Sequence, residues 1–139
     1  MDVESRLALA DHEPAVIAFL EENEGALDRD GAVDGQYWLT LRPKSTPQER
    51  FYVCLAWSVY PHRPASVRFA DAVGGAFGVP HAWPSIPNYR VPNDICKAFT
   101  AEGYAAHPEW RWSTDGNPFL WTVTVLQDDL DTKYTGRAG

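Results

Sequence analysis

The chain has few cysteines, few basic residues and no long apolar run. Its two cysteines, Cys54 and Cys96, are too few for a disulfide framework or a four-thiolate zinc site. No segment approaches the roughly 20 apolar residues that cross a bilayer, and the N-terminus lacks the basic and then apolar pattern of a signal peptide. We therefore expect a cytoplasmic protein with no membrane partner, no metal and no cofactor.

Basic residues are outnumbered by acidic ones. Lys and Arg number 12 against 19 Asp and Glu, which gives a net charge of -7. Proteins gain affinity for nucleic acids mainly through cations that displace the counterions of the phosphates. The charge therefore argues against a nucleic-acid partner and is compatible with a basic protein surface as a partner.

Hydrophobic residues make up 45% of the chain and charged residues 22%, which is typical of a globular domain. No repeat or low-complexity linker interrupts the sequence, so we expect one domain over residues 1–139. The six tryptophans indicate either a core of large rings or an interface. Core filling is the commoner role for the four in the second half of the chain, which are Trp83, Trp110, Trp112 and Trp121.

Apolar spacing and turn residues predict an α+β domain. A helix with Asp11 as its cap and Pro14 in its first turn is expected to end at Gly25. Turn-forming residues at 29–35 lead into alternating segments. These segments predict strands at 37–43, 50–60 and 66–69. A long irregular segment rich in proline follows over residues 70–117.

A second helix is predicted near the end of the sequence. Asn117 is a suitable N-cap, and Pro118 suits the first helical position. The apolar stripe of this helix consists of Phe119, Val123, Leu126 and Leu130. Its acids, which we expect to form a solvated helix end, are Asp128, Asp129 and Asp131. Residues 132–139 are expected to be flexible.

Two short motifs lie beside and within the irregular segment. The string VYPHRPASVRF ends the second predicted strand and begins the third. Downstream, Asn88 follows Pro87, and Cys96 comes eight positions after Asn88 and directly after Ile95. The order and separation of the two motifs make them informative together, whereas each alone is weak.

Together these motifs resemble the ubiquitin-conjugating enzyme family over about residues 37–130. The strand signature of the family is matched by Tyr60, Pro61, Pro64, Val67 and Phe69, with Ala65 in place of a second proline. The last two residues of its His-Pro-Asn triplet and its catalytic cysteine are matched by Pro87, Asn88 and Cys96. A tryptophan that follows the cysteine in the family is matched by Trp110 or Trp112.

The resemblance implies an antiparallel meander sheet packed on helices, with the active site on the irregular segment. Cys96 would then accept a ubiquitin-like modifier as a thioester from an activating enzyme and pass it to an amine or to a partner protein, such as a ligase or substrate. Asn88 would hydrogen-bond the oxyanion that forms when the amine attacks. A segment stiffened by prolines presents such a thiol to solvent. Further candidates for partner contacts are Tyr60, Pro61, His81 and Trp110.

The chain also departs from the family. Ile86 replaces the histidine of the triplet, and His81 is the candidate to brace the loop in its place. Lys97 replaces a leucine, and the sequence ends soon after its last predicted helix, without the additional C-terminal helices of the family. We therefore expect a divergent branch of the kind found among prokaryotic conjugating-enzyme-like families. Nearby genes for an activating enzyme or a deconjugating peptidase would indicate bacterial defence or regulation.

Other interpretations of these residues remain open. The main alternative is a non-catalytic binding or adaptor module for a ubiquitin-like protein. Asn88 is also a common turn residue, and a free cysteine is often a buried apolar side chain, which is what we expect of Cys54. A cysteine hydrolase would need His81 or His107 beside Cys96. A zinc site built from these cysteines and histidines follows no known ligand spacing.

Overall fold

The computed structural model describes all residues from Met1 to Gly139. A four-stranded antiparallel meander, in the order β1-β2-β3-β4, is preceded by a long helix and followed, after an irregular segment, by another. The elements that build this frame are α1 (Val3–Glu22), β1 (Ala26–Arg29), β2 (Gln36–Leu41), β3 (Phe51–Ala56), β4 (Ser66–Ala70) and α3 (Pro118–Thr132). The predicted α+β class with an antiparallel meander is confirmed.

Helix α1 is capped by Asp2 and begins at Val3, so the expected cap at Asp11 was wrong. The carboxylate of Asp2 accepts the Ser5 backbone N–H at 2.7 Å, which satisfies one of the free donors of the first turn. Pro14 lies inside the helix rather than in its first turn. The helix turns Leu9, Val16 and Leu20 toward the core.

Strand β1 was not expected, and β3 is shorter than predicted. β1 lies at the edge of the sheet, and its residues are mostly exposed, so it lacks the apolar alternation that marks a half-buried strand. Its register pairs Leu27 with Leu39 and Arg29 with Tyr37. β3 ends at Ala56, although Trp57 and Tyr60 beyond it are still buried.

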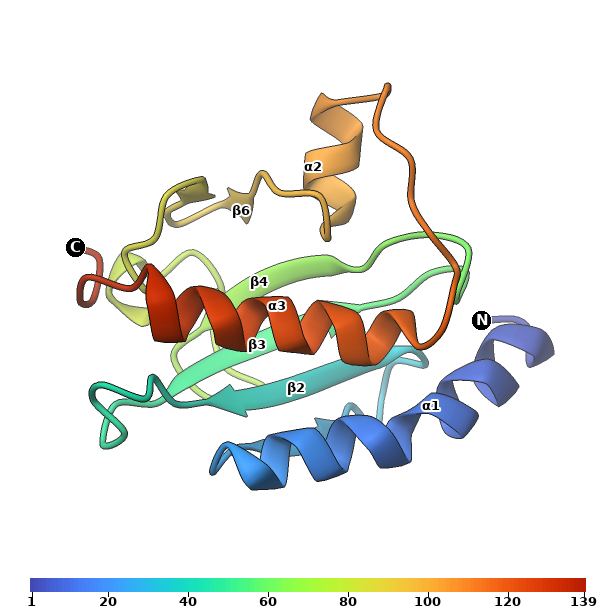
Figure 1. The fold of residues 1–139 in the computed structure, drawn as a ribbon, viewed down its shortest axis with the longest axis horizontal. Helices are drawn as coiled ribbons and strands as arrows, with labels where there is room; N and C mark the ends of the chain where they lie inside the picture. Colours follow the sequence, from blue (N-terminus) through green and yellow to red (C-terminus); the bar gives the residue numbers. More distant parts are fainter.

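Helix α3 is confirmed where the sequence predicts it. Asn117 caps it by accepting the Leu120 backbone N–H at 2.9 Å, and Pro118 occupies its first turn. Figure 1 shows α3 lying across the sheet with α1 beside it, so that the two long helices cover the same face. The whole predicted apolar stripe is buried, namely Phe119, Val123, Leu126 and Leu130.

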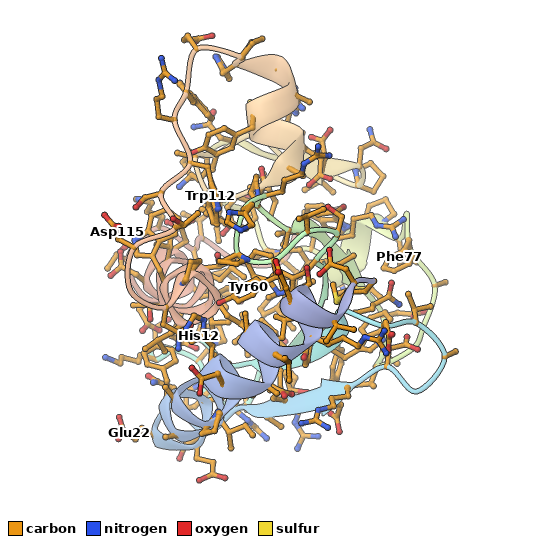
Figure 2. All side chains as sticks on the ribbon, turned by 90° about the vertical axis from the view of Figure 1, so that its right-hand side faces the viewer. His12, Glu22, Tyr60, Phe77, Trp112 and Asp115 are labelled. Atoms are coloured by element: carbon orange, nitrogen blue, oxygen red, sulfur yellow. The ribbon has the colours of Figure 1, made fainter.

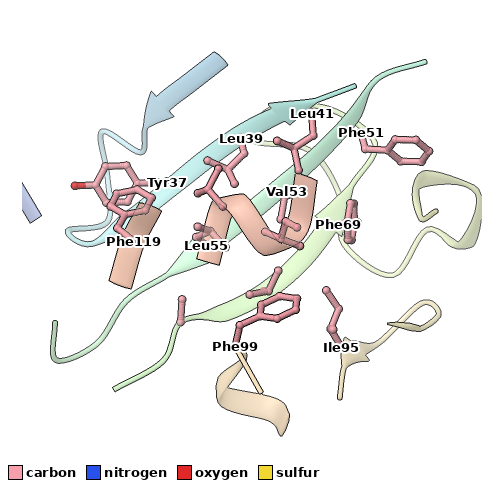
Figure 3. Packing of buried hydrophobic residues seen from close by; sticks show 14 of the residues in the cluster. Tyr37, Leu39, Leu41, Phe51, Val53, Leu55, Phe69, Ile95, Phe99 and Phe119 are labelled. Carbon is pink, nitrogen blue, oxygen red and sulfur yellow. The ribbon is translucent and has the colours of Figure 1, made fainter. Parts of the chain in front are cut away.

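The core lies between these helices and the sheet. Side chains of β2, β3 and β4 that alternate toward the helices are fully buried, as Leu39, Val53 and Phe69 are. Ile95 and Phe99 reach the same core from the irregular segment (Figure 3). None of the helices is both long enough and apolar enough to cross a membrane.

The segment between β4 and α3 contains short regular pieces. These are a single 3-10 turn (Pro80–Ala82), a two-stranded hairpin of β5 (Tyr89–Arg90) and β6 (Asp94–Ile95), and the short helix α2 (Ala101–Ala106). The residues after α3, which the sequence predicts to be flexible, run beside this segment. The Ala138 N–H donates to the Trp83 carbonyl at 2.9 Å, and the Ser85 N–H donates to the Gly136 carbonyl at 2.8 Å.

Candidate functional site

Asn88 and Cys96 lie next to each other at the base of the β5–β6 hairpin. Tyr89 pairs with Ile95 and Arg90 with Asp94 in this hairpin, so the next antiparallel pair outward is Asn88 with Cys96. The Cys96 N–H donates to the Asn88 carbonyl at 3.0 Å. The spacing of eight positions in the sequence is therefore the spacing that closes this hairpin.

The backbone of Asn88 has a positive φ of 70°, in the left-handed region. Asn adopts this region more readily than most other residues, because its short polar side chain tolerates it. The side chain of Asn88 is exposed. The turn role of Asn88 and a role for its amide in chemistry are therefore compatible with each other.

The two cysteines have different surroundings. Cys54 on β3 is 2% exposed, and burial raises the pKa of its thiol to about 11, so it is the packed thiol that we expected. Cys96 is partly exposed. Its neighbour Ile95 is fully buried, and Phe99 anchors the chain again three residues later (Figure 3). Cys96 is therefore the thiol that an external reagent or protein can reach.

An ion pair lies on the hairpin that carries Cys96. The Arg90 guanidinium donates to the Asp94 carboxylate at 2.6 and 3.0 Å. The pKa of Arg90 is raised, first by this hydrogen bond and the Asp94 charge and to a smaller degree by the proximity of Cys96. Arg90 therefore places a permanent positive charge on the hairpin that carries Cys96.

Asp129 is buried, which corrects our expectation of a solvated acid. It is 1% exposed, whereas Asp128 on the same turn is exposed. Its carboxylate accepts hydrogen bonds from the Tyr89 hydroxyl, the Lys97 ammonium and the Lys133 ammonium. The sequence did indicate this burial, because position 129 is three residues after Leu126 and therefore lies on the same inward face of the helix. Lys133 is an i,i+4 partner on the same helix, whereas Tyr89 and Lys97 are 40 and 32 residues away in sequence and carried no such signal.

Tyr60 and Pro61, two candidates for partner contacts, have roles inside the fold. Tyr60 is 1% exposed, and its hydroxyl accepts the Phe119 backbone N–H at 3.1 Å and contacts the Nδ1 of His12. Figure 2 shows Tyr60 and His12 close together, where α1 meets the rest of the core. The carbonyl of Pro61 accepts the indole N–H of Trp112 at 2.8 Å.

His81 and Trp110 lie on different parts of the segment. His81 is exposed, and its backbone carbonyl accepts from Arg137, whereas Ile86 is buried. Trp110 is half-buried and stacks on His107 with ring centroids 4.1 Å apart.

Neither His81 nor His107 forms a hydrogen bond with the Cys96 thiol, and His107 pairs instead with Glu109 at 3.2 Å. No group of three or more His, Cys, Asp or Glu side chains is arranged to hold a metal ion. The Cys96 site therefore consists of a thiol, an amide and a nearby cation, without an imidazole.

A cavity of about 520 Å³ includes Ala98 in its lining. Ala98 is two residues after Cys96 in the sequence. Its aromatic walls are Tyr104, Trp112 and Trp121, and Asp115 and Arg111 add charge at its edge. Trp121 is 47% exposed, which is unusual for a tryptophan on the first turns of a core helix. Figure 2 shows Trp112 and Asp115 on the connection between α2 and α3. Tyr104 and Asp115 were not singled out from the sequence.

Comparison of the chain with protein-family models and with curated proteins finds no match to either.

Proposed function

We propose that the chain is a ubiquitin-conjugating-type carrier that holds a ubiquitin-like modifier as a thioester on Cys96. The observation that carries this proposal is the pairing of Asn88 with Cys96 across the base of one hairpin, with the thiol partly exposed. The four-stranded meander, with α3 across it and the cysteine on the irregular segment before α3, is compatible with that family.

The chemistry has two steps. The Cys96 thiolate attacks the thioester carbonyl of the modifier on its activating enzyme, a new S–C bond forms, the old S–C bond breaks, and the sulfur of the activating enzyme leaves as a thiolate. An amine of the acceptor then attacks the carbonyl on Cys96, the S–C bond breaks, and the amine loses its proton to solvent. The Asn88 amide N–H donates to the oxyanion in this second step.

The test uses a Cys54→Ala background, so that Cys96 is the only thiol. The chain is incubated with ATP, a ubiquitin-like protein and the enzyme that activates that protein, and non-reducing gels are compared with and without dithiothreitol. We expect an adduct that dithiothreitol removes, and none with Cys96→Ala. Loading of the Cys96→Ala variant would contradict the proposal.

The role of Asn88 is separable from loading. Asn88→Gly, which keeps the left-handed backbone accessible, is expected to load normally and to discharge to free lysine about 100-fold more slowly, because removal of one oxyanion donor costs roughly 10²–10³ in rate. Asn93→Gly is the matched control, since Asn93 is exposed in the turn of the same hairpin and does not pair with Cys96. Equal discharge rates in the two variants would remove Asn88 from the mechanism.

The cavity beside Ala98 favours a second candidate, a non-catalytic adaptor for a ubiquitin-like protein. Its exposed Trp121 is the type of residue that dominates protein interfaces. Stable binding of the modifier by the Cys96→Ala variant, measured by calorimetry, together with no adduct in the parent chain, would establish this alternative.

A further inference from the structure

Asp129 is a buried charge that the proposed chemistry does not use. It lies on the last turns of α3 and is 1% exposed. Its Oδ2 accepts from the Tyr89 hydroxyl at 2.8 Å and from the Lys97 ammonium at 3.0 Å, and its Oδ1 accepts from the Lys133 ammonium at 3.1 Å. A buried carboxylate is stable only with such partners, so each of the three is held in place in return.

Two of these partners are the immediate neighbours of the proposed catalytic pair. Tyr89 follows Asn88, and Lys97 follows Cys96. The Cys96 N–H bond to the Asn88 carbonyl joins the two strands at this position. A closed ring of covalent and hydrogen bonds therefore runs from Asp129 through Tyr89, Asn88, Cys96 and Lys97 back to Asp129.

This arrangement also fixes direction. Asn88 and Cys96 lie just outside β5 and β6, so the burial of each side chain, and not strand alternation, shows which way it faces. Tyr89 is 6% exposed and the Lys97 side chain 16%, and both face Asp129. The intervening Asn88 is exposed and Cys96 partly exposed. The Lys97 ammonium also lies 5.8 Å from the centre of the Tyr89 ring, which packs the two anchors together.

We infer that Asp129 is a positioning residue: by binding Tyr89 and Lys97 it holds the two ends of the Asn88–Cys96 pair on α3 and aims both side chains outward. The departure at Lys97 from the leucine of the family then has a physical role, because the lysine connects the cysteine segment to the helix. The inference rests on the proposed function for its effect on transfer, whereas the anchor itself can be measured without any modifier.

Lys133 provides the matched control. It binds the same carboxylate, but from one turn further along α3, so its removal takes one ammonium from Asp129 without releasing the hairpin. The variants Lys97→Met, Lys97→Arg and Lys133→Met are prepared in the full chain with Cys54→Ala. Tyr89→Phe, which removes only the hydroxyl, releases the other end of the ring.

The first measurement is amide hydrogen exchange at the Cys96 N–H, followed by NMR. Lys97→Met and Tyr89→Phe should each accelerate exchange about tenfold or more, because the hairpin then opens locally without global unfolding. Lys133→Met should stay within about twofold of the parent, and Lys97→Arg should restore most of the protection. Equal acceleration by Lys97→Met and Lys133→Met, or no acceleration by Lys97→Met, would overturn the anchor.

The second measurement compares two reactions of the same thiol. Lys97→Met should slow discharge of the loaded modifier to free lysine about tenfold and change iodoacetamide alkylation of Cys96 by less than about threefold, since only discharge needs the geometry of the Cys96–Asn88 pair. Parallel changes in both reactions would overturn a positioning role. If the parent chain never loads, the proposed function fails, and the exchange data still decide whether Asp129 anchors the hairpin.

Discussion

The frame of sheet and long helices and the segment between β4 and α3 are stabilised in different ways. The frame is built on continuous apolar burial and on the backbone ladders of β1 to β4. The segment contributes apolar side chains to the same core, among them Trp83, Ile95 and Phe99, and it also depends on polar anchors. These polar anchors are the carboxylate of Asp129 and the hydroxyl of Thr100, which donates to the Ile95 carbonyl at 2.6 Å.

Because of this difference, the stability of the fold and the reactivity of Cys96 should depend on different residues. Truncation in the frame should act on the whole fold, since a close-packed core cannot refill a cavity. Changes at the polar anchors of the segment should act mainly on Cys96, because each removes a hydrogen bond and leaves the apolar core filled. Chemical groups presented by such a segment can be adjusted one anchor at a time while the sheet stays intact.

The largest effect is expected in the centre of the frame. Leu55 on β3 is fully buried, so Leu55→Ala should lower the free energy of unfolding by about 2–5 kcal/mol, measured by urea denaturation with tryptophan fluorescence. Leu7→Ala is the control, because Leu7 is 66% exposed and its truncation should cost less than about 0.5 kcal/mol. Similar losses for the two variants would contradict the distinction between frame and surface.

A smaller effect is expected where α2 meets the cysteine segment. A Cβ at Gly103 would collide with the carbonyl oxygen of Lys97, which is backbone and cannot move alone. Gly103→Ala should therefore destabilise by about 1–3 kcal/mol, although alanine favours a helix by roughly 1 kcal/mol over glycine. Gly31→Ala is the control, since nothing lies within 4 Å of its Cβ position. A stabilised Gly103→Ala variant would show that α2 does not pack tightly on the segment.

The frame was largely predictable from sequence, and the reasons are local. Asn117 and Pro118 mark the start of α3 by cap chemistry, and alternation marks β2 to β4. The start of α1 was missed because Asp11 and Pro14 imitate a cap and first turn that Asp2 supplies nine residues earlier. β1 was missed because an exposed edge strand needs no apolar alternation.

The segment was predictable only where a resemblance gave a spacing. The spacing of eight positions predicted that Asn88 and Cys96 act together, and the register of the β5–β6 hairpin explains why they are neighbours. The Asp129 ring was not predictable, because it joins Tyr89, Lys97 and a helix 32 residues beyond Lys97 through a buried carboxylate. A lone acid near a helix end is usually solvated, and only tertiary packing distinguishes the exception.

The buried thiol of the frame should also make stability depend on pH. The Cys54 pKa of about 11 in the folded chain lies above the ordinary thiol value, because burial disfavours the thiolate. The contribution of the neutral Cys54 thiol to the free energy of unfolding is therefore complete below about pH 8.5, and it is lost as pH rises toward about 11. Denaturation at pH 7 and 10.5 should show a smaller pH-dependent loss in Cys54→Ala than in the parent. An equal loss in Cys96→Ala and Cys54→Ala would contradict this assignment.

The smallest effect is expected at the ion pair on the hairpin. Asp94→Asn releases Arg90 from its carboxylate and leaves the guanidinium free to attract the Cys96 thiolate, so alkylation of Cys96 at neutral pH should become about two- to threefold faster. Arg90→Gln should slow it by a similar factor. The free energy of unfolding should change by less than about 1 kcal/mol in both variants, because exposed ion pairs contribute little.

Raising the salt concentration should bring the alkylation rates of the two variants together, since mobile ions screen the Arg90 charge. Rates that stay apart at high salt would mean that these substitutions act on Cys96 through the shape of the hairpin, and the segment would then couple its surface to its thiol by packing rather than by charge.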